Sequence, residues 1–315
     1  MTSLDWNPEE IGFPKIDDSE MIKKLSLPSD RLDVVIDTDT YNEVDDQFAL
    51  AYALNSPDRL HLEALYAAPF LNSRSVSPAD GMEKSFNEII KLLGKTKHDS
   101  RDFVFKGSDR FLRDTKDPVT SPAALDLIRR ARDMADGRLL YVVSIGAITD
   151  VASAILLQPD IIDKIVVVWL GGHPVYWPDT KEFNLMEDML SARVVLDCGV
   201  PLIRIPCMGV ASHLLTSLPE LERYLMGKND LCDMLVQNFR EYRKDHFGWA
   251  KEIWDIATIG YLMNSDWTVS VLDHSPVLTE QCTWSIDQTR HLVRTVMSLS
   301  RNQIFADMFR KISLP

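Results

Sequence analysis

Short runs of β-branched and aliphatic residues alternate with longer amphipathic stretches along most of the chain, starting near Leu32. Such alternation is typical of β-α units, which build a mainly parallel sheet with helices packed against it. The pattern predicts strands at residues 33–36, 62–67, 139–143, 165–170 and 202–205. It predicts helices at residues 45–55, 81–93, 123–135, 149–157, 186–197 and 218–224. We therefore expect an α/β fold with an open, mainly parallel sheet flanked by helices.

The first 30 residues differ from the rest of the chain, because they contain prolines and many charges but little periodicity. We expect residues 1–30 to form an extension that wraps the domain or stays partly mobile. No internal repeat, low-complexity tract or Gly/Ser linker interrupts the remaining residues. Residues 31–315 are therefore predicted to form a single domain.

The composition favours a globular protein that acts on a small molecule. The chain has 315 residues, 45% of them hydrophobic, and a formal net charge of −13 at pH 7. An excess of negative charge opposes binding to nucleic acid and to anionic membranes, since both need clustered Lys and Arg. We expect a small-molecule substrate, with neither nucleic acid nor membrane as a partner.

Cysteine usage and the amino-terminal segment indicate a reducing compartment. The four cysteines form no CxxC pair and are too sparse for a disulfide framework: Cys198, Cys207, Cys232 and Cys282. The amino terminus lacks the basic region and apolar core of a secretory signal. The most apolar stretch, residues 139–157, is interrupted by polar residues and suits a strand and a helix better than a membrane span. We expect the protein in the cytoplasm.

Five carboxylates follow the first predicted strand within ten residues, in the segment VVIDTDTYNEVDDQ: Asp37, Asp39, Glu43, Asp45 and Asp46. Such crowding is costly unless a cation or a helix amino terminus compensates it. In open α/β sheets ligands bind at the carboxyl ends of the strands, which is where these residues stand. One interpretation is a metal site; the other is a set of helix caps and surface acids.

Two later segments favour the metal site. In the segment SIGAITD a strand ends in a tight turn, so the backbone carbonyls of Ser144 and Ile145 are expected near the same edge of the sheet. Asp255 stands at the start of an apolar helix, from which its carboxylate can point to that edge. Oxygen ligands without His or Cys select Ca²⁺ or Mg²⁺ over zinc.

Four motifs in order carry a family resemblance: DTDTYNEVDD, SIGAITD, KEFN at residues 181–184, and the Trp-Asp pair at residues 254–255. From about Leu32 onward the chain resembles the calcium-dependent, inosine-uridine preferring nucleoside hydrolases. The resemblance implies a Rossmann-like nucleoside hydrolase fold and a homo-oligomer. It also implies Ca²⁺-dependent hydrolysis of the N-glycosidic bond of a nucleoside or a related ribosylated compound, without an organic cofactor.

The same resemblance implies a role for individual residues. The metal ligands would be Asp39, Asp46, the backbone carbonyl of Ile145, and Asp255. The catalytic residues would be Asp39 as the general base, Asp45, and Trp254. The substrate-binding residues would be Asp45, Glu182, Asn184, Asn72 and Trp254, with Asp37 behind the metal ligands.

Trp254 bears on the choice of base. Purine-preferring members of the family carry Trp here and activate the base by stacking, so purines are slightly favoured. The alternative is a core indole beside Ile253 and Ile256. The polar segment before it, YRKDHFGWAKE, is either a mobile lid or a plain solvated loop.

The chain departs from the family pattern around the sugar. Phe70 and Tyr176 stand where the family has substrate-binding asparagines, and Asp150 replaces a third asparagine. Asn72 is either a substitute contact or a turn residue. The TYNEV loop before Asp45 is longer than in the family and has no glycine. Among the remaining histidines, expected to be structural, His173 is set apart because it follows a Gly-Gly pair after a predicted strand.

Two other classes of function remain open. The DTDT segment also resembles the first motif of haloacid-dehalogenase-type phosphatases, although Tyr41 occupies a position that family fills with Thr or Val. The replaced sugar contacts suggest instead a noncatalytic sugar-binding or assembly protein of the same fold.

Overall fold

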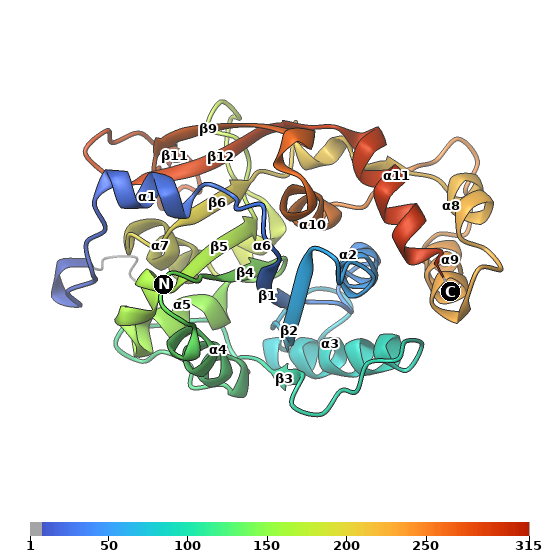
Figure 1. Ribbon diagram of the computed structural model, residues 1–315, viewed down its shortest axis with the longest axis horizontal. Coiled ribbons are helices and arrows are strands. Elements are labelled where there is room, and N and C mark those ends of the chain that lie inside the picture. The colour runs from blue at the N-terminus through green and yellow to red at the C-terminus, as the bar shows by residue number, and fades with distance from the viewer. Residues whose placement is uncertain (1–7, 315) are drawn as a thin grey trace.

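An eight-stranded sheet forms the centre of the computed structural model, which describes residues 8–314 (Figure 1). Its strand order is β3-β2-β1-β4-β5-β6-β12-β9, and every neighbouring pair is parallel except β12 with β9. The strands are β1 (Leu32–Thr38), β2 (Leu60–Ala67), β3 (Val104–Lys106), β4 (Leu140–Ser144), β5 (Ile165–Leu170), β6 (Leu202–Ile205), β9 (Thr268–His274) and β12 (Leu292–Leu299). The prediction of an open, mainly parallel sheet is confirmed.

Helices cover both faces of the sheet, and each face has its own hydrophobic core. Alternate residues of a strand point to opposite faces, so Val34 and Ile36 enter one core while Val35 enters the other. The first core holds α2 (Asp45–Leu54), α3 (Pro78–Leu93), α9 (Asp230–Tyr242), α10 (Ile256–Met263) and α11 (Arg301–Ile312). The second holds α4 (Pro122–Asp133), α5 (Thr149–Leu157) and α7 (Met189–Asp197).

The predicted helix at residues 186–197 is confirmed over residues 189–197, which form α7, but its start is wrong, because residues 183–187 form a separate helix, α6 (Phe183–Glu187). Asp188 separates them with φ −141° and ψ 78°, outside the helical region. Its carboxylate accepts a hydrogen bond from the backbone N–H of Ser191 and so caps the second helix. This break turns the chain directly after the EFN motif.

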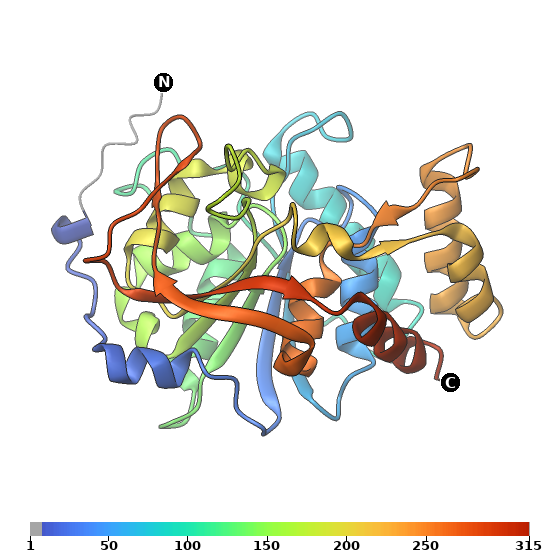
Figure 2. The same ribbon diagram turned by 90° about the horizontal axis from the view of Figure 1, so that it is seen from above.

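Residues 18–24, within the predicted extension, form helix α1 (Asp18–Lys24), which lies beside β12 at one edge of the sheet (Figure 2). Met21 and Leu25 are buried there, and Arg294 of β12 donates a hydrogen bond to the Leu25 carbonyl at 2.9 Å. Residues 1–7 of the predicted extension lie outside the described residues.

The shorter elements are η1 (Pro8–Glu10), η2 (Pro159–Asp163), η3 (Ala211–His213), β7 (Leu215–Thr216), α8 (Leu218–Tyr224), β8 (Lys251–Glu252), η4 (Ser265–Trp267), β10 (Val277–Leu278) and β11 (Trp284–Ser285). Strands β7 and β8 pair with each other, and α8 packs against α9 at one end of the molecule (Figure 1). Between Pro8 and Leu314, no helix combines the length and apolar character needed to cross a membrane.

Candidate functional site

A cavity of about 380 Å³ lies at the carboxyl ends of the central strands. Its walls come from segments that directly follow β1, β4, β5 and β6, and from the start of α10. Five of the acidic side chains on these walls come from two distant parts of the chain: Asp39, Glu43, Asp45, Asp46 and Asp255. The topology therefore collects carboxylates where an α/β sheet binds ligands.

The carboxylates form a tight cluster. Oxygen atoms of Asp45, Asp46 and Asp255 lie within 4.8 Å of one another, and the side chain of Asp39 is within hydrogen-bonding reach of Asp46. All four residues are at most 4% exposed. Asp45 and Asp46 occupy the first turn of α2, where free N–H groups and the helix dipole favour negative charge. Thr38 adds one hydrogen bond, since its hydroxyl donates to Asp46 at 2.5 Å.

The electrostatics of this cluster fit a bound cation. Burial, followed by repulsion from neighbouring carboxylates, raises the pKa of Asp39, Asp46 and Asp255 well above the usual range. Burial also raises the pKa of Asp45 to about 6, against the opposing attraction of Lys251. The Oδ2 atom of Asp39 is buried without a hydrogen-bond partner. An all-oxygen set of this kind fits a hard divalent cation, which would neutralise the repulsion and satisfy the orphaned atom.

Ile145, the expected carbonyl ligand, follows β4 and lines the same cavity. Behind it lie two further buried carboxylates, Asp37 and Asp150, and repulsion from Asp150 adds to the burial that raises the pKa of Asp37. Asp150 accepts hydrogen bonds from the hydroxyls of Ser108 at 2.8 Å and Ser121 at 2.6 Å. It does not line the cavity, so its replacement of the family asparagine leaves the walls unaltered.

Glu182 and Asn184 line the cavity as the sequence predicts. Glu182 is the N-cap of α6, and its carboxylate accepts hydrogen bonds from the backbone N–H groups of Gly172, Asn184 and Leu185 at 2.8–3.1 Å. The Asn184 amide donates to the carbonyl of Leu170 at 3.1 Å. Both side chains are thus fixed in orientation before any ligand enters.

Asn72 also lines the cavity, together with Asn42, which the sequence analysis missed. The Asn72 amide donates to the Asn42 side-chain oxygen at 2.5 Å, which joins the loop after β2 to the long loop after β1. Arg74 strengthens this junction by stacking 4.4 Å from the centre of the Tyr41 ring. The extra length of the TYNEV loop is therefore used to contact a second loop.

The two aromatic replacements do not fill the cavity. Phe70 is completely buried and does not line the cavity. The Phe70 backbone packs so closely on Gly81 that a side chain at position 81 would collide with it. Tyr176 is 58% exposed and does not line the cavity. His173 lines the cavity beside Glu182 instead, a position that only its place after the Gly-Gly pair signalled in the sequence.

Trp254 is half-buried, lines the cavity and packs against the first core. Its role in stacking on a base stays a prediction. Nearby, the ammonium group of Lys251 pairs with Glu43, and the Tyr242 hydroxyl donates to the same carboxylate at 3.3 Å. Lys251 is 6% exposed and was also missed by the sequence analysis. These contacts attach both ends of the YRKDHFGWAKE segment to the long loop after β1, while Phe247 in its middle is 96% exposed.

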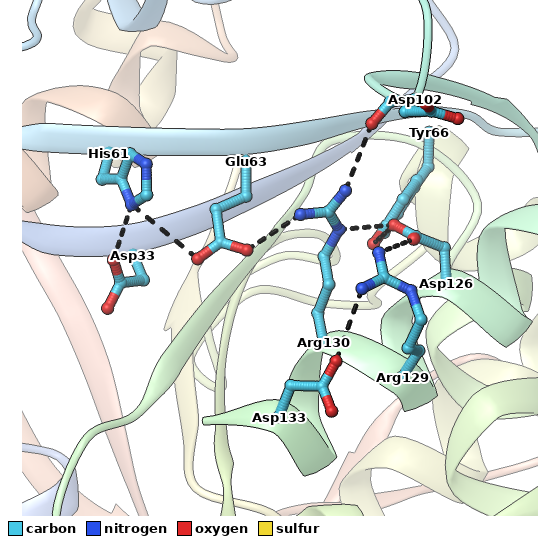
Figure 3. Close-up of polar contacts among 9 residues, drawn as sticks. All are labelled: Asp33, His61, Glu63, Tyr66, Asp102, Asp126, Arg129, Arg130 and Asp133. Atoms are coloured by element: carbon cyan, nitrogen blue, oxygen red, sulfur yellow. Dashed lines mark hydrogen bonds and ion pairs between the residues drawn. The ribbon is translucent and has the colours of Figure 1, made fainter. Parts of the chain in front are cut away.

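A second group with metal-ligand side chains, Asp33, His61 and Glu63, lies on β1 and β2 (Figure 3). Here each carboxylate already has a cation: Arg138 pairs with Asp33, and Arg130 pairs with Glu63 at 2.9 Å. The His61 ring donates to the Asp33 carboxylate at 2.8 Å and is half exposed. This group is a neutralised ion-pair network that ties β1 and β2 to α4, and it is not a candidate metal site.

Size alone does not identify a site either. A larger cleft of about 590 Å³ lies between α8 and α11, away from the carboxyl ends of the strands. Its lining contains one carboxylate, Glu220, which is already paired with Arg301. We therefore base the assignment on the smaller, carboxylate-lined cavity.

The mainly parallel sheet, covered on both faces, carries at its carboxyl edge a polar cavity and a buried carboxylate cluster that could hold a divalent metal. Comparison with known families identifies the family: the sequence model described as inosine-uridine preferring nucleoside hydrolase matches residues 34–310. The chain belongs to this family.

Curated relatives and solved structures agree with the assignment. A putative pyrimidine-specific ribonucleoside hydrolase from Shigella boydii is 29% identical over 141 residues, which cover 42% of this chain and 57% of that protein. A pyrimidine-specific ribonucleoside hydrolase from Shigella flexneri is 28% identical over 141 residues, 42% of this chain and 44% of that protein. The matched segment thus spans only about half the length of these relatives.

The fold is similar over nearly the whole chain. A purine-preferring ribonucleoside hydrolase from Gardnerella vaginalis superposes with a TM-score of 0.68 at 18% identity, covering 89% of this chain and 98% of that one. A plant nucleoside hydrolase gives a TM-score of 0.69 at 17% identity, covering 90% of this chain and 99% of that one. At such identity the structures establish the shared fold.

Proposed function

We propose that this protein is a Ca²⁺-dependent hydrolase that cleaves the N-glycosidic bond of a nucleoside or a related ribosylated compound. The observation that carries the proposal is the convergence of Asp39 and Asp46 with the distant Asp255 in one buried carboxylate cluster. Family membership and the polar cavity beside that point support it.

The residues suggest a division of labour. Asp39, Asp46, Asp255 and the Ile145 carbonyl would hold the cation, which when bound supplies Lewis-acid activation of a water molecule and anchors the ribose diol. Asp39 would take a proton from that water while the water oxygen forms a bond to the anomeric carbon. The electron pair of the breaking C–N bond leaves with the base, which takes up a proton from solvent, while Asp39 returns its proton to solvent. Asp45 would hold a ribose hydroxyl.

The rest of the cavity would hold the sugar and the base. Glu182, oriented by three backbone N–H groups, and Asn184 would bind ribose hydroxyls. Asn72, braced by Asn42, would supply a further amide. The carboxylates nearby favour the positive charge that develops on the sugar in the transition state. Trp254 would stack on the base, and this large flat surface favours purines.

Base release from a panel of purine and pyrimidine ribonucleosides, measured by chromatography with added Ca²⁺, tests the proposal. We expect free base to appear with the wild type and not with Asp39→Ala, while Asp136→Ala, a change at a fully exposed acid, keeps wild-type activity. Absence of hydrolysis across the whole panel would refute the proposal. A noncatalytic sugar-binding protein would then be favoured if calorimetry shows nucleoside binding without product.

The family assignment removes the main reason for considering a phosphatase. We further propose a homo-oligomer, which light scattering on the purified protein tests. Cytoplasmic location is proposed as well, supported by four cysteines that are all buried and unpaired. Cell fractionation checks it.

A further inference from the structure

The cavity needs a polar group that the family pattern does not supply. Two positions expected to bind the sugar carry Phe70, which is fully buried, and Tyr176, which is 58% exposed. Asn72 and Asn42 restore amides near the carboxylate cluster. The end of the cavity beside Glu182 therefore lacks the contact that an asparagine at position 176 would have made, unless another residue provides it.

His173 occupies that end, and its backbone is fixed on both sides. Its N–H donates to the Thr180 hydroxyl at 2.8 Å, and its carbonyl accepts from the Trp284 indole N–H at 2.8 Å. Gly172 precedes it with φ +70°, and a side chain there would come within 2.6 Å of the Thr180 hydroxyl. The turn thus depends on glycine and directs the imidazole into the cavity wall.

The imidazole itself is buried but incompletely hydrogen-bonded. His173 is 9% exposed, its ring lies edge-on to Trp177 with centroids 6.3 Å apart, and Nδ1 has no hydrogen-bond partner. Burial lowers the pKa of His173, while attraction to Asp179 and a hydrogen bond with the Gly172 backbone oppose this effect. The ring is therefore neutral at pH 7 and offers one donor and one acceptor. An unpaired buried nitrogen is costly and is commonly matched by a ligand or water.

The position of His173 selects one hydroxyl of a ribose. The neighbouring Gly172 N–H binds the Glu182 carboxylate at 2.8 Å, so the imidazole belongs to the Glu182 part of the cavity. If the cation anchors the 2′,3′-diol, the hydroxyl left for the Glu182 part of the cavity is the 5′-hydroxyl.

We propose that His173 is a sugar-binding residue of this chain, which hydrogen-bonds the 5′-hydroxyl of the substrate in place of the side chain lost at Tyr176. The inference rests on the proposed nucleoside hydrolase function and deepens it, because it names the residue of this chain that contacts the 5′-hydroxyl. A neutral hydrogen bond lost from a buried site corresponds to about a tenfold change in kcat/KM.

The test combines a residue change with removal of its hydroxyl partner. kcat/KM is measured for adenosine, inosine and uridine and for their 5′-deoxy counterparts, with the wild type, His173→Ala and His173→Gln. We expect His173→Ala to lower kcat/KM about tenfold for the ribonucleosides and less than threefold for the 5′-deoxy compounds. His173→Gln, which keeps a polar group, should recover most of the loss. His98→Ala, a change at an exposed histidine far from the cavity, should leave kcat/KM unchanged for both the ribonucleosides and the 5′-deoxy compounds.

Equal losses on both substrate series would overturn the proposal, because a structural role for His173 does not distinguish the substrates. If the wild type hydrolyses nothing, the hydrolase function fails and the same pairs are measured for binding by calorimetry with Ca²⁺. A selective loss of ribonucleoside affinity in His173→Ala then still supports the contact. Equal affinities of wild type and variant would refute it.

Discussion

Adding Ca²⁺ to the metal-free protein should raise its melting temperature, because only the folded chain brings the four carboxylates together. A ligand at 100 times its dissociation constant stabilises the folded state by about 2.7 kcal/mol. A chain of 315 residues has an unfolding entropy of about 0.66 kcal/mol/K, from about 2.1 cal/mol/K per residue. The expected rise is therefore about 4 °C, measured by differential scanning calorimetry or fluorimetry against a sample in chelator.

Two matched variants show whether the carboxylate cluster causes the Ca²⁺-dependent rise in melting temperature. Asp46→Asn removes one ligand and part of the mutual repulsion, so it should abolish the Ca²⁺-dependent rise while keeping or raising the melting temperature in chelator. Asp33→Asn alters the other acidic group, in which the carboxylate is already paired with Arg138, and should leave the rise intact. A rise that survives Asp46→Asn, or one that disappears in Asp33→Asn, would refute the assignment of the cation to this cluster.

Three further changes probe the site and its support. Trp254→Ala should lower kcat/KM for purine ribonucleosides about 10- to 100-fold, since stacking contributes about 1–3 kcal/mol. Trp254→Phe should lower kcat/KM much less, and an equal loss in both variants would argue against stacking. Lys251→Met removes the cation paired with Glu43 and should reduce the free energy of unfolding in urea by about 1–3 kcal/mol. This is below the range for fully buried pairs because Glu43 is 37% exposed; no change would show that the pair is unimportant. Gly107→Ala should lower the free energy of unfolding by about 1–3 kcal/mol in the same assay, because the added methyl group would collide with Asp150 and the Ala67 carbonyl. A variant as stable as the wild type would contradict this packing.

Four of the five strands that the sequence predicts, β1, β4, β5 and β6, are buried at every position. Burial on both faces gives each of them a short run of β-branched and aliphatic residues. Strand β9 at the edge of the sheet carries exposed apolar residues such as Val269 and Val271. In its neighbour β12, the register of pairing shifts between Val296 and Ser298. Neither strand has a clear period, which explains why the sequence analysis missed both.

The carboxylate cluster was predictable because the topology of a parallel sheet brings residues that follow strands to one edge. Asn42 and Lys251 were not, since their positions depend on contacts between loops. Lys251 meets Glu43 across 208 residues of sequence, and no local pattern announces such a pair. His173 had one signal, its place after two glycines at a strand end, but its burial and its unpaired nitrogen required the structure.

The location of the cation tests the central claim most directly. A crystal grown with Ca²⁺, measured at a wavelength where calcium scatters anomalously, should show one ion in the cavity. We expect carboxylate oxygens of Asp39, Asp46 and Asp255 and the carbonyl of Ile145 about 2.3–2.6 Å from it. An ion bound instead at Asp33 and Glu63, or a cavity that stays free of calcium at saturating concentration, would contradict the account.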